Sequence, residues 1–295
     1  MLKFFRNITN LPDSLGYLLA VLAWALWVPD ILQTPTNISL YFSITLCLIN
    51  GFLFVHTCQK GGFIQTFSPL PLFVFFLWFG AFKQWHTDIY THIAVLVWLI
   101  ITRLVQDSFR SERAMRPVYI TSLLLSVCSL FMPQTILLIP IVWIGIIERR
   151  AWQGRVVLAT LLAIATIAIC FSIAFYFNLI DIYTFAEITS GQWFSDSMLL
   201  IVLLSITLLF AVIALPSYMK ENTNQRFLIL WATITFVSTM LLGTYHLALF
   251  PSVLCLALLA SVALQTYCFT SVKSVLTGIL FLLQVPLAAT VWYFL

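Results

Sequence analysis

Two groups of arginines flank one apolar stretch in the middle of this chain. The first group lies between Arg103 and Arg116 and the second between Arg149 and Arg155, and the residues between the groups are mostly apolar, with a break at Pro133. Positively charged residues beside membrane segments stay on the cytoplasmic side, so both ends of the stretch are expected on that side. The stretch therefore predicts two short helices, or a re-entrant hairpin, that enter the membrane and return.

The composition also indicates a membrane protein. The chain has 295 residues, of which 62% are hydrophobic and 8% are charged, whereas about a quarter of the residues in a soluble protein are charged. We therefore expect an all-α, polytopic transmembrane helix bundle that forms one integral membrane domain over residues 1–295. The net charge of +4 comes from basic residues in short connections, where orientation explains them, so nucleic acid is not an expected partner. The six cysteines lack CxxC spacing, and neither a cofactor nor a metal site is expected.

About eleven membrane segments are predicted, with the N-terminus in the cytoplasm and the C-terminus outside. The third to sixth segments have 14 to 16 residues, fewer than the ~20 that a full crossing needs, so we expect them to be re-entrant or to lie inside the bundle. The predicted segments are Leu15–Leu32, Ile38–Cys58, Phe67–Phe82, Thr91–Leu104, Val118–Met132, Gln134–Ile147, Val156–Phe177, Ser197–Leu215, Phe227–Leu242, His246–Cys268 and Val275–Leu295.

The predicted topology makes the two faces of the protein chemically different. It places thirteen of the fourteen Lys and Arg residues inside and leaves only Lys83 outside. Five carboxylates and three of the four histidines lie on the outer side, so chemistry is expected there. Trp27 and Trp85 are expected near the outer membrane boundary, and the pattern of residues 178–196 predicts an interfacial helix on the outer surface.

Asp30 is the first candidate catalytic residue. It ends the first predicted helix on the outer side, directly after Pro29. A carboxylate beside an apolar wall that water still reaches can act as a general base on a substrate that arrives from the lipid. The alternative is a solvated residue at the end of a helix, without a chemical role.

The second predicted outer loop, KQWHTDIYTH, holds the other candidates. We predict that Asp88 is a second catalytic carboxylate and that Lys83, His86 and His92 bind substrate. His246 could join these residues only if the loop before the tenth segment folds over the second loop. The spacing of the histidines and Asp88 meets no stringent metal pattern, and the alternative is that these residues only keep a short loop hydrated.

Three stretches resemble a known family: SPLPLFVFFLWFG, HIAVLVWLIITRLVQDSFRSERA, and WIGIIERRAWQGR after an SLFMP break. Together with the segments between them, they resemble an uncharacterised family of Bacteroidota inner-membrane proteins, known as a domain of unknown function. The resemblance covers most of the chain and implies a multi-pass protein of the bacterial inner (cytoplasmic) membrane. The family has no assigned catalytic residues, so it implies none here.

The layout is also similar, more loosely, to C-type membrane glycosyltransferases, which use polyprenyl-phosphate-linked sugars. These enzymes have a cytoplasmic N-terminus, a catalytic acidic residue in the first outer loop and further polar groups in the second. The similarity implies that Asp30 activates an acceptor and that a membrane lipid, such as a polyprenyl phosphate, is the substrate. In those enzymes the first outer loop is typically long, whereas only Ile31–Asn37 separates Asp30 from the second helix here.

Three functions remain open at this point. The first is the handling of a lipid-linked saccharide or lipid phosphate on the outer face, and the second is a noncatalytic membrane subunit that docks a protein partner in a larger envelope complex. The third is a membrane oxygenase with iron held by histidines, for which His56 would have to join the outer histidines. An ion-coupled transporter is disfavoured because the strongly polar residues within the segments, Asn50, Gln265 and Gln284, are uncharged.

Overall fold

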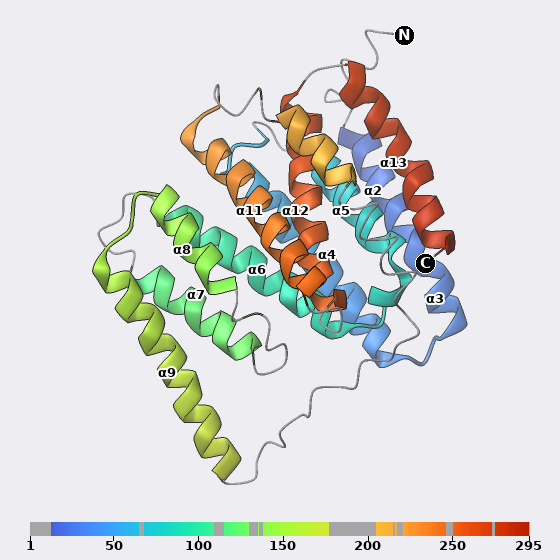
Figure 1. Cartoon of the computed structure of the whole chain (residues 1–295). Coiled ribbons are helices and arrows are strands. Elements are labelled where there is room, and N and C mark those ends of the chain that lie inside the picture. Colours follow the sequence, from blue (N-terminus) through green and yellow to red (C-terminus); the bar gives the residue numbers. More distant parts are fainter. Residues whose placement is uncertain are drawn as a thin grey trace.

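The protein is a bundle of helices (Figure 1). The computed structural model describes residues 13–64, 68–108, 115–129, 135, 138–176, 205–214, 216, 221–245, 250–272 and 275–294. No strand occurs among these residues, so the all-α prediction is confirmed. The helices are α2 (Asp13–Trp24), η2 (Ala25–Trp27), α3 (Val28–Gln33), α4 (Ile38–Lys60), α5 (Leu70–Ala81), η3 (Lys83–Trp85), α6 (Ile89–Asp107), α7 (Met115–Cys128), α8 (Ile139–Glu148), α9 (Gly154–Tyr176), α11 (Thr223–Tyr245), α12 (Phe250–Ser271) and α13 (Val275–Phe294), with a further helix at Ser205–Ala214.

Five helical stretches in the described part of the chain are long and apolar enough to cross a membrane. They are Ser14–Gln33, Ile38–Lys60, Ile89–Asp107, Leu254–Ser271 and Leu276–Tyr293. This supports the membrane assignment, while eleven crossings and their orientation stay predictions. The predicted interfacial helix at 178–196 lies outside the described residues.

The prediction that the fourth segment is short was wrong. We expected Thr91–Leu104, but α6 has 19 residues. It begins earlier because Asp88 caps its first turn, and it continues through the polar residues Gln106 and Asp107, which a count of apolar residues leaves out. Helices α5 and α8 are short, with 12 and 10 residues.

Helix α5 forms the centre of the bundle. All twelve of its residues are buried, and it packs against α2, α4, α12 and α13. At 1.5 Å per residue the helix is about 18 Å long, too short for a hydrocarbon core about 30 Å thick. The surrounding helices therefore replace lipid around α5, which explains how a short and very apolar helix is accommodated.

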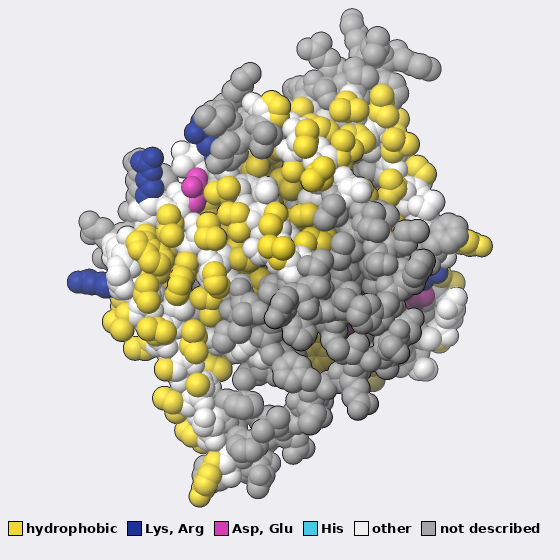
Figure 2. Space-filling model, viewed as in Figure 1, with side chains coloured by type: hydrophobic (Ala, Val, Ile, Leu, Met, Phe, Trp, Pro, Cys, Tyr) yellow, Lys and Arg dark blue, Asp and Glu magenta, His cyan; other side chains and the backbone are white. Residues whose placement is uncertain are grey.

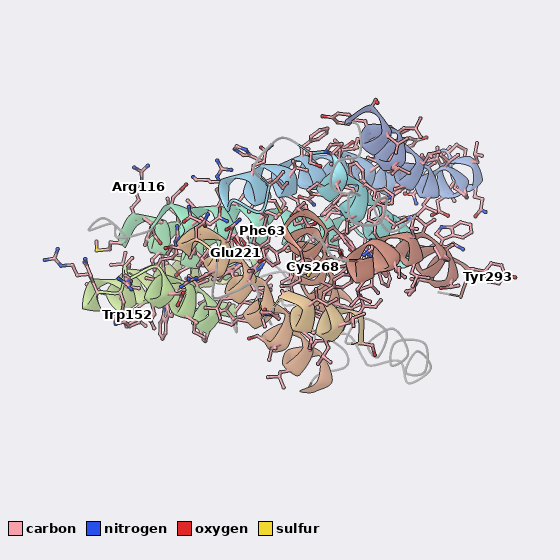
Figure 3. All side chains as sticks on the ribbon, turned by 90° about the horizontal axis from the view of Figure 1, so that it is seen from above. Phe63, Arg116, Trp152, Glu221, Cys268 and Tyr293 are labelled. Atoms are coloured by element: carbon pink, nitrogen blue, oxygen red, sulfur yellow. The ribbon has the colours of Figure 1, made fainter. Side chains whose placement is uncertain are left out.

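Helices α6, α7, α8, α9 and α11 extend the bundle to the side away from α2 and α13 (Figure 1). Helices α4 and α6 pack together, as do α11 and α12, while α9 packs mainly on α7. Figure 3 shows the resulting elongated cross-section, with Arg116 and Trp152 towards one end and Tyr293 at the other. Figure 2 shows hydrophobic side chains spread over the described part of the visible face, and large apolar side chains such as Leu158 and Leu283 are exposed. An apolar surface of this extent suits contact with lipid.

Polar contacts join the helix ends that the sequence assigns to the inner face. The Lys60 ammonium pairs with Asp107, which links the ends of α4 and α6. Arg149, only 3% exposed, follows α8 and donates to Asn224 Oδ1 at 2.9 Å and to the backbone oxygen of Gln106. These contacts place the residues together at one end of the bundle. A cation beside the last carbonyls of a helix is also favourable. Which side of the membrane this end faces stays a prediction.

Four polar side chains and one indole within the helices form a connected set of hydrogen bonds. Gln265 Oε1 accepts from Trp78 Nε1 at 2.9 Å and from Gln284 Nε2. Gln265 Nε2 donates to Ser261 Oγ at 3.1 Å, and Thr207 Oγ1 donates to the same oxygen at 2.8 Å. The hydrogen bonds connect α5, α12, α13 and the helix Ser205–Ala214 in the apolar interior, where a polar group without a partner is costly.

Candidate functional site

The local helix geometry positions Asp30. Pro29 has no backbone N–H and cannot continue an α-helical hydrogen-bond ladder, and the chain before it forms the tight turn η2. Asp30 lies in the first turn of α3. Its carboxylate Oδ2 pairs with His86 Nδ1, while 24% of its side chain remains exposed. The pair joins two of the predicted site residues across 56 positions of sequence.

His86 is held from three sides in the turn between α5 and α6. Its Nδ1 contacts Asp30, its Nε2 lies 3.1 Å from the backbone oxygen of Gly80, and its ring stacks on Trp27 with centroids 3.9 Å apart. Gly80 permits this arrangement, because a Cβ there would lie 3.2 Å from Leu26 Cβ and 3.3 Å from the backbone oxygen of Ala23. The glycine therefore lets α5 approach the chain that carries Asp30.

The two contacts of the His86 ring determine how the pair holds protons. Both ring nitrogens face oxygen atoms, Oδ2 of Asp30 and the carbonyl of Gly80, so both hydrogen bonds form only when the pair carries two protons. Burial lowers the pKa of His86 below its usual value, although the bond to Asp30 raises it, and the charge of Lys83 lowers it further. Burial therefore disfavours the doubly protonated pair, and the contact with the Asp30 carboxylate favours a proton on His86 Nδ1.

His92 lies beside this pair, fully buried in the first turn of α6. Its Nε2 donates to the backbone oxygen of Trp85 at 3.1 Å, and its ring centroid is 5.7 Å from that of Trp27. Asn50 Nδ2 of α4 donates to the backbone oxygen of His92 at 2.9 Å. His92 is therefore part of the same cluster but is not accessible to a substrate.

The bond from Asn50 shows that the site lies deep relative to α4. Asn50 is twelve residues after Ile38, the start of α4, or about 18 Å along the helix. His92 is three residues after Ile89, the start of α6, or about 5 Å along it. The Lys60–Asp107 pair joins the ends of α4 and α6, so the two helices run roughly parallel, and the turn before α6 lies on the order of 13 Å below the start of α4.

Asp88 and Lys83 do not join the Asp30–His86 pair directly. Asp88 caps α6, accepting from the backbone N–H of Tyr90 at 3.1 Å and from the hydroxyl of Thr91, so its hydrogen bonds already have a structural role. The Lys83 ammonium lies 3.9 Å above the ring of Trp292 in α13. His246 lies outside the described residues.

Several residues of the site were missed by sequence reasoning. Trp27 and Trp85 were expected only as residues near the outer membrane boundary, which stays a prediction, and the structure adds that they are 0% and 1% exposed and pack inside the protein. The sequence carries no signal for the role of Gly80. Among the described residues, no group of three or more His, Cys, Asp or Glu side chains could hold a metal ion, and His56 is exposed on α4, so the described part offers no iron site for an oxygenase.

The chain matches no protein-family model, no curated protein and no solved structure. The resemblance to the Bacteroidota family and the similarity to C-type glycosyltransferases therefore stay predictions.

Proposed function

We propose that this protein acts on a lipid-linked saccharide or lipid phosphate at the outer face of the bacterial inner membrane, with Asp30 as the general base and His86 as its positioning residue. The observation that carries the proposal is the Asp30–His86 pair. The carboxylate is partly exposed, whereas the histidine behind it is 1% exposed. A substrate can therefore reach Asp30, and His86 holds the carboxylate in place.

The hydrogen bonds of the pair suit this role. His86 Nδ1 contacts Oδ2 of Asp30, and Oδ1 of Asp30 makes no hydrogen bond with a described residue. Oδ1 can take the proton of an acceptor hydroxyl as the hydroxyl oxygen bonds to the anomeric carbon of the sugar. The bond between that carbon and the phosphate oxygen breaks in the same step, and the polyprenyl phosphate leaves with the electron pair.

The surroundings of Asp30 suit a substrate with a lipid tail. Val28 and Leu32, on either side of Asp30 in sequence, are exposed, as are Ile38 and Phe42 at the start of α4. Apolar side chains here can contact an isoprenoid tail while the polar headgroup reaches the carboxylate. Lys83 is near enough to lower the pKa of His86, so it is a candidate to neutralise the leaving phosphate.

A transfer assay tests the proposal. The full chain is placed in lipid nanodiscs with a labelled polyprenyl-phosphate-linked hexose and a lipid-linked saccharide acceptor, and transfer of the label is measured. We expect transfer by the natural sequence and a loss of about 10²- to 10⁴-fold for Asp30→Asn. His86→Gln should show a smaller loss.

Asp88→Asn is the matched control, because asparagine caps a helix about as well as aspartate. If Asp88 only caps α6, this variant keeps its activity. Equal losses in the two variants would assign catalysis to Asp88 as well. Unchanged transfer by Asp30→Asn would refute the proposal.

A further inference from the structure

Four buried side chains around the Asp30–His86 pair carry polar atoms without a hydrogen-bond partner. These atoms are Trp27 Nε1, Trp85 Nε1, His92 Nδ1 and Asn50 Oδ1, and each of the four residues is at most 1% exposed. A buried polar atom left in this state costs roughly 1–3 kcal/mol. Native proteins satisfy nearly all such atoms, either with protein groups or with ordered water.

The four residues belong to one connected cluster. The ring of Trp27 lies 5.7 Å from that of His92, and His92 Nε2 contacts the backbone oxygen of Trp85. Asn50 Nδ2 contacts the backbone oxygen of His92. The residues come from η2, η3, α4 and α6, so the cluster lies where four separate elements meet.

The unpaired atoms are chemically complementary. The two indole nitrogens can only donate. Because His92 uses Nε2 to donate to Trp85, its Nδ1 is an acceptor, and Asn50 Oδ1 is another. Water both donates and accepts, and a buried water typically makes about three hydrogen bonds.

We infer that this cluster is a binding site for ordered water, in which water accepts from Trp27 and Trp85 and donates to His92 and Asn50. The site lies directly behind His86, because Trp27 also stacks on that ring. It places water in the interior of the bundle next to the Asp30–His86 pair. The inference goes beyond the proposed function and does not depend on it, since water would occupy the site whether or not the pair is catalytic.

X-ray radiolytic footprinting of the full chain in nanodiscs tests this inference, since the hydroxyl radicals form from water and oxidise adjacent side chains. Trp78 and Trp231 are the matched controls, because both are buried and their Nε1 atoms donate to Gln265 and Thr102 at 2.9 Å. We expect Trp27 and Trp85 to be oxidised several-fold faster than the two controls. Equal oxidation rates for all four tryptophans would overturn the inference.

A second measurement tests whether the water is shared. Trp27→Phe keeps an aromatic ring but removes one donor, so oxidation of Trp85 should fall while oxidation of the control Trp231 stays the same. An unchanged rate at Trp85 would refute a site shared by the two indoles. These readouts need no substrate, so a negative result here leaves the test of Asp30 untouched, and inactivity of the protein would not affect the footprint.

Discussion

Replacing Gln265 by leucine should weaken the bundle, because this carboxamide connects α5, α12 and α13. Its Oε1 accepts from Trp78 and Gln284, and its Nε2 donates to Ser261. Gln265 is fully buried, so water does not replace a lost bond from outside. Leucine has a similar volume but forms none of the three hydrogen bonds, and it leaves the indole N–H of Trp78 without its acceptor.

The size of the effect follows from these contacts. Hydrogen bonds between membrane helices contribute about 0.6 kcal/mol each, so the two bonds to Trp78 and Gln284 contribute about 1 kcal/mol; the bond to Ser261 lies within α12. An unpaired buried donor such as Trp78 Nε1 costs a further ~1–3 kcal/mol. We therefore expect Gln265→Leu to lower the free energy of unfolding by about 3 kcal/mol. Gln284→Leu removes the same group from the neighbouring helix but breaks one bond to Gln265, and about 1 kcal/mol or less is expected.

Equilibrium unfolding in mixtures of mild detergent and dodecyl sulfate, followed by circular dichroism, gives both free energies on one scale. The natural chain, Gln265→Leu and Gln284→Leu are compared under the same conditions. The reasoning fails if Gln265→Leu is as stable as Gln284→Leu, because the structure gives Gln265 the larger number of partners.

Two further predictions concern charged and titratable groups. Arg149→Gln should lower the free energy of unfolding by about 3 kcal/mol, since two hydrogen bonds from a charged group are lost. The exposed control Arg155→Gln should change the free energy of unfolding by less than about 0.5 kcal/mol. Equal changes in the two variants would contradict the prediction. Because burial lowers the pKa of folded His86 below the ordinary 6.5, the unfolded chain binds the proton first as the pH falls, so this contribution to stability is present above about pH 6.5 and is lost below it. Between pH 7.5 and 5, the melting temperature should fall less for His86→Gln than for the natural chain. An identical dependence of melting temperature on pH in the two proteins would contradict this prediction.

The sequence predicted the helices because their signals are local. An apolar run followed by a polar or glycine-containing break predicts a helix and its end, as at α4, whose residues Ile38–Lys60 are close to the predicted Ile38–Cys58. The length of α6 was underestimated because polar residues such as Gln106 extend its last turn. Hydropathy scores Gln106 and Asp107 as polar and so ends the predicted helix before them. In the fold Asp107 pairs with Lys60 and Gln106 is buried against other helices, so the helix continues.

The candidate site was predictable in its residue types but not in its contacts. Asp30 and His86 were selected because carboxylates and histidines are rare in an apolar chain, yet no pattern indicated that they form a pair. Asp88 was selected for the same reason, and the structure shows it capping α6. An Asp before a helix is a common capping residue, so that role could have been recognised from the sequence.

The sequence by itself determined that this protein is a bundle of apolar helices, approximately where helices such as α4 lie along the chain, and which few polar residues are candidates for chemistry. Only the tertiary structure decided that Asp30 meets His86, that Trp27 and Trp85 are buried around them, and that Gln265 joins three helices. The physical reason is that hydropathy and capping depend on neighbours in sequence, whereas these contacts depend on how closely helices approach. At Gly80 that approach depends on the absence of a single Cβ atom.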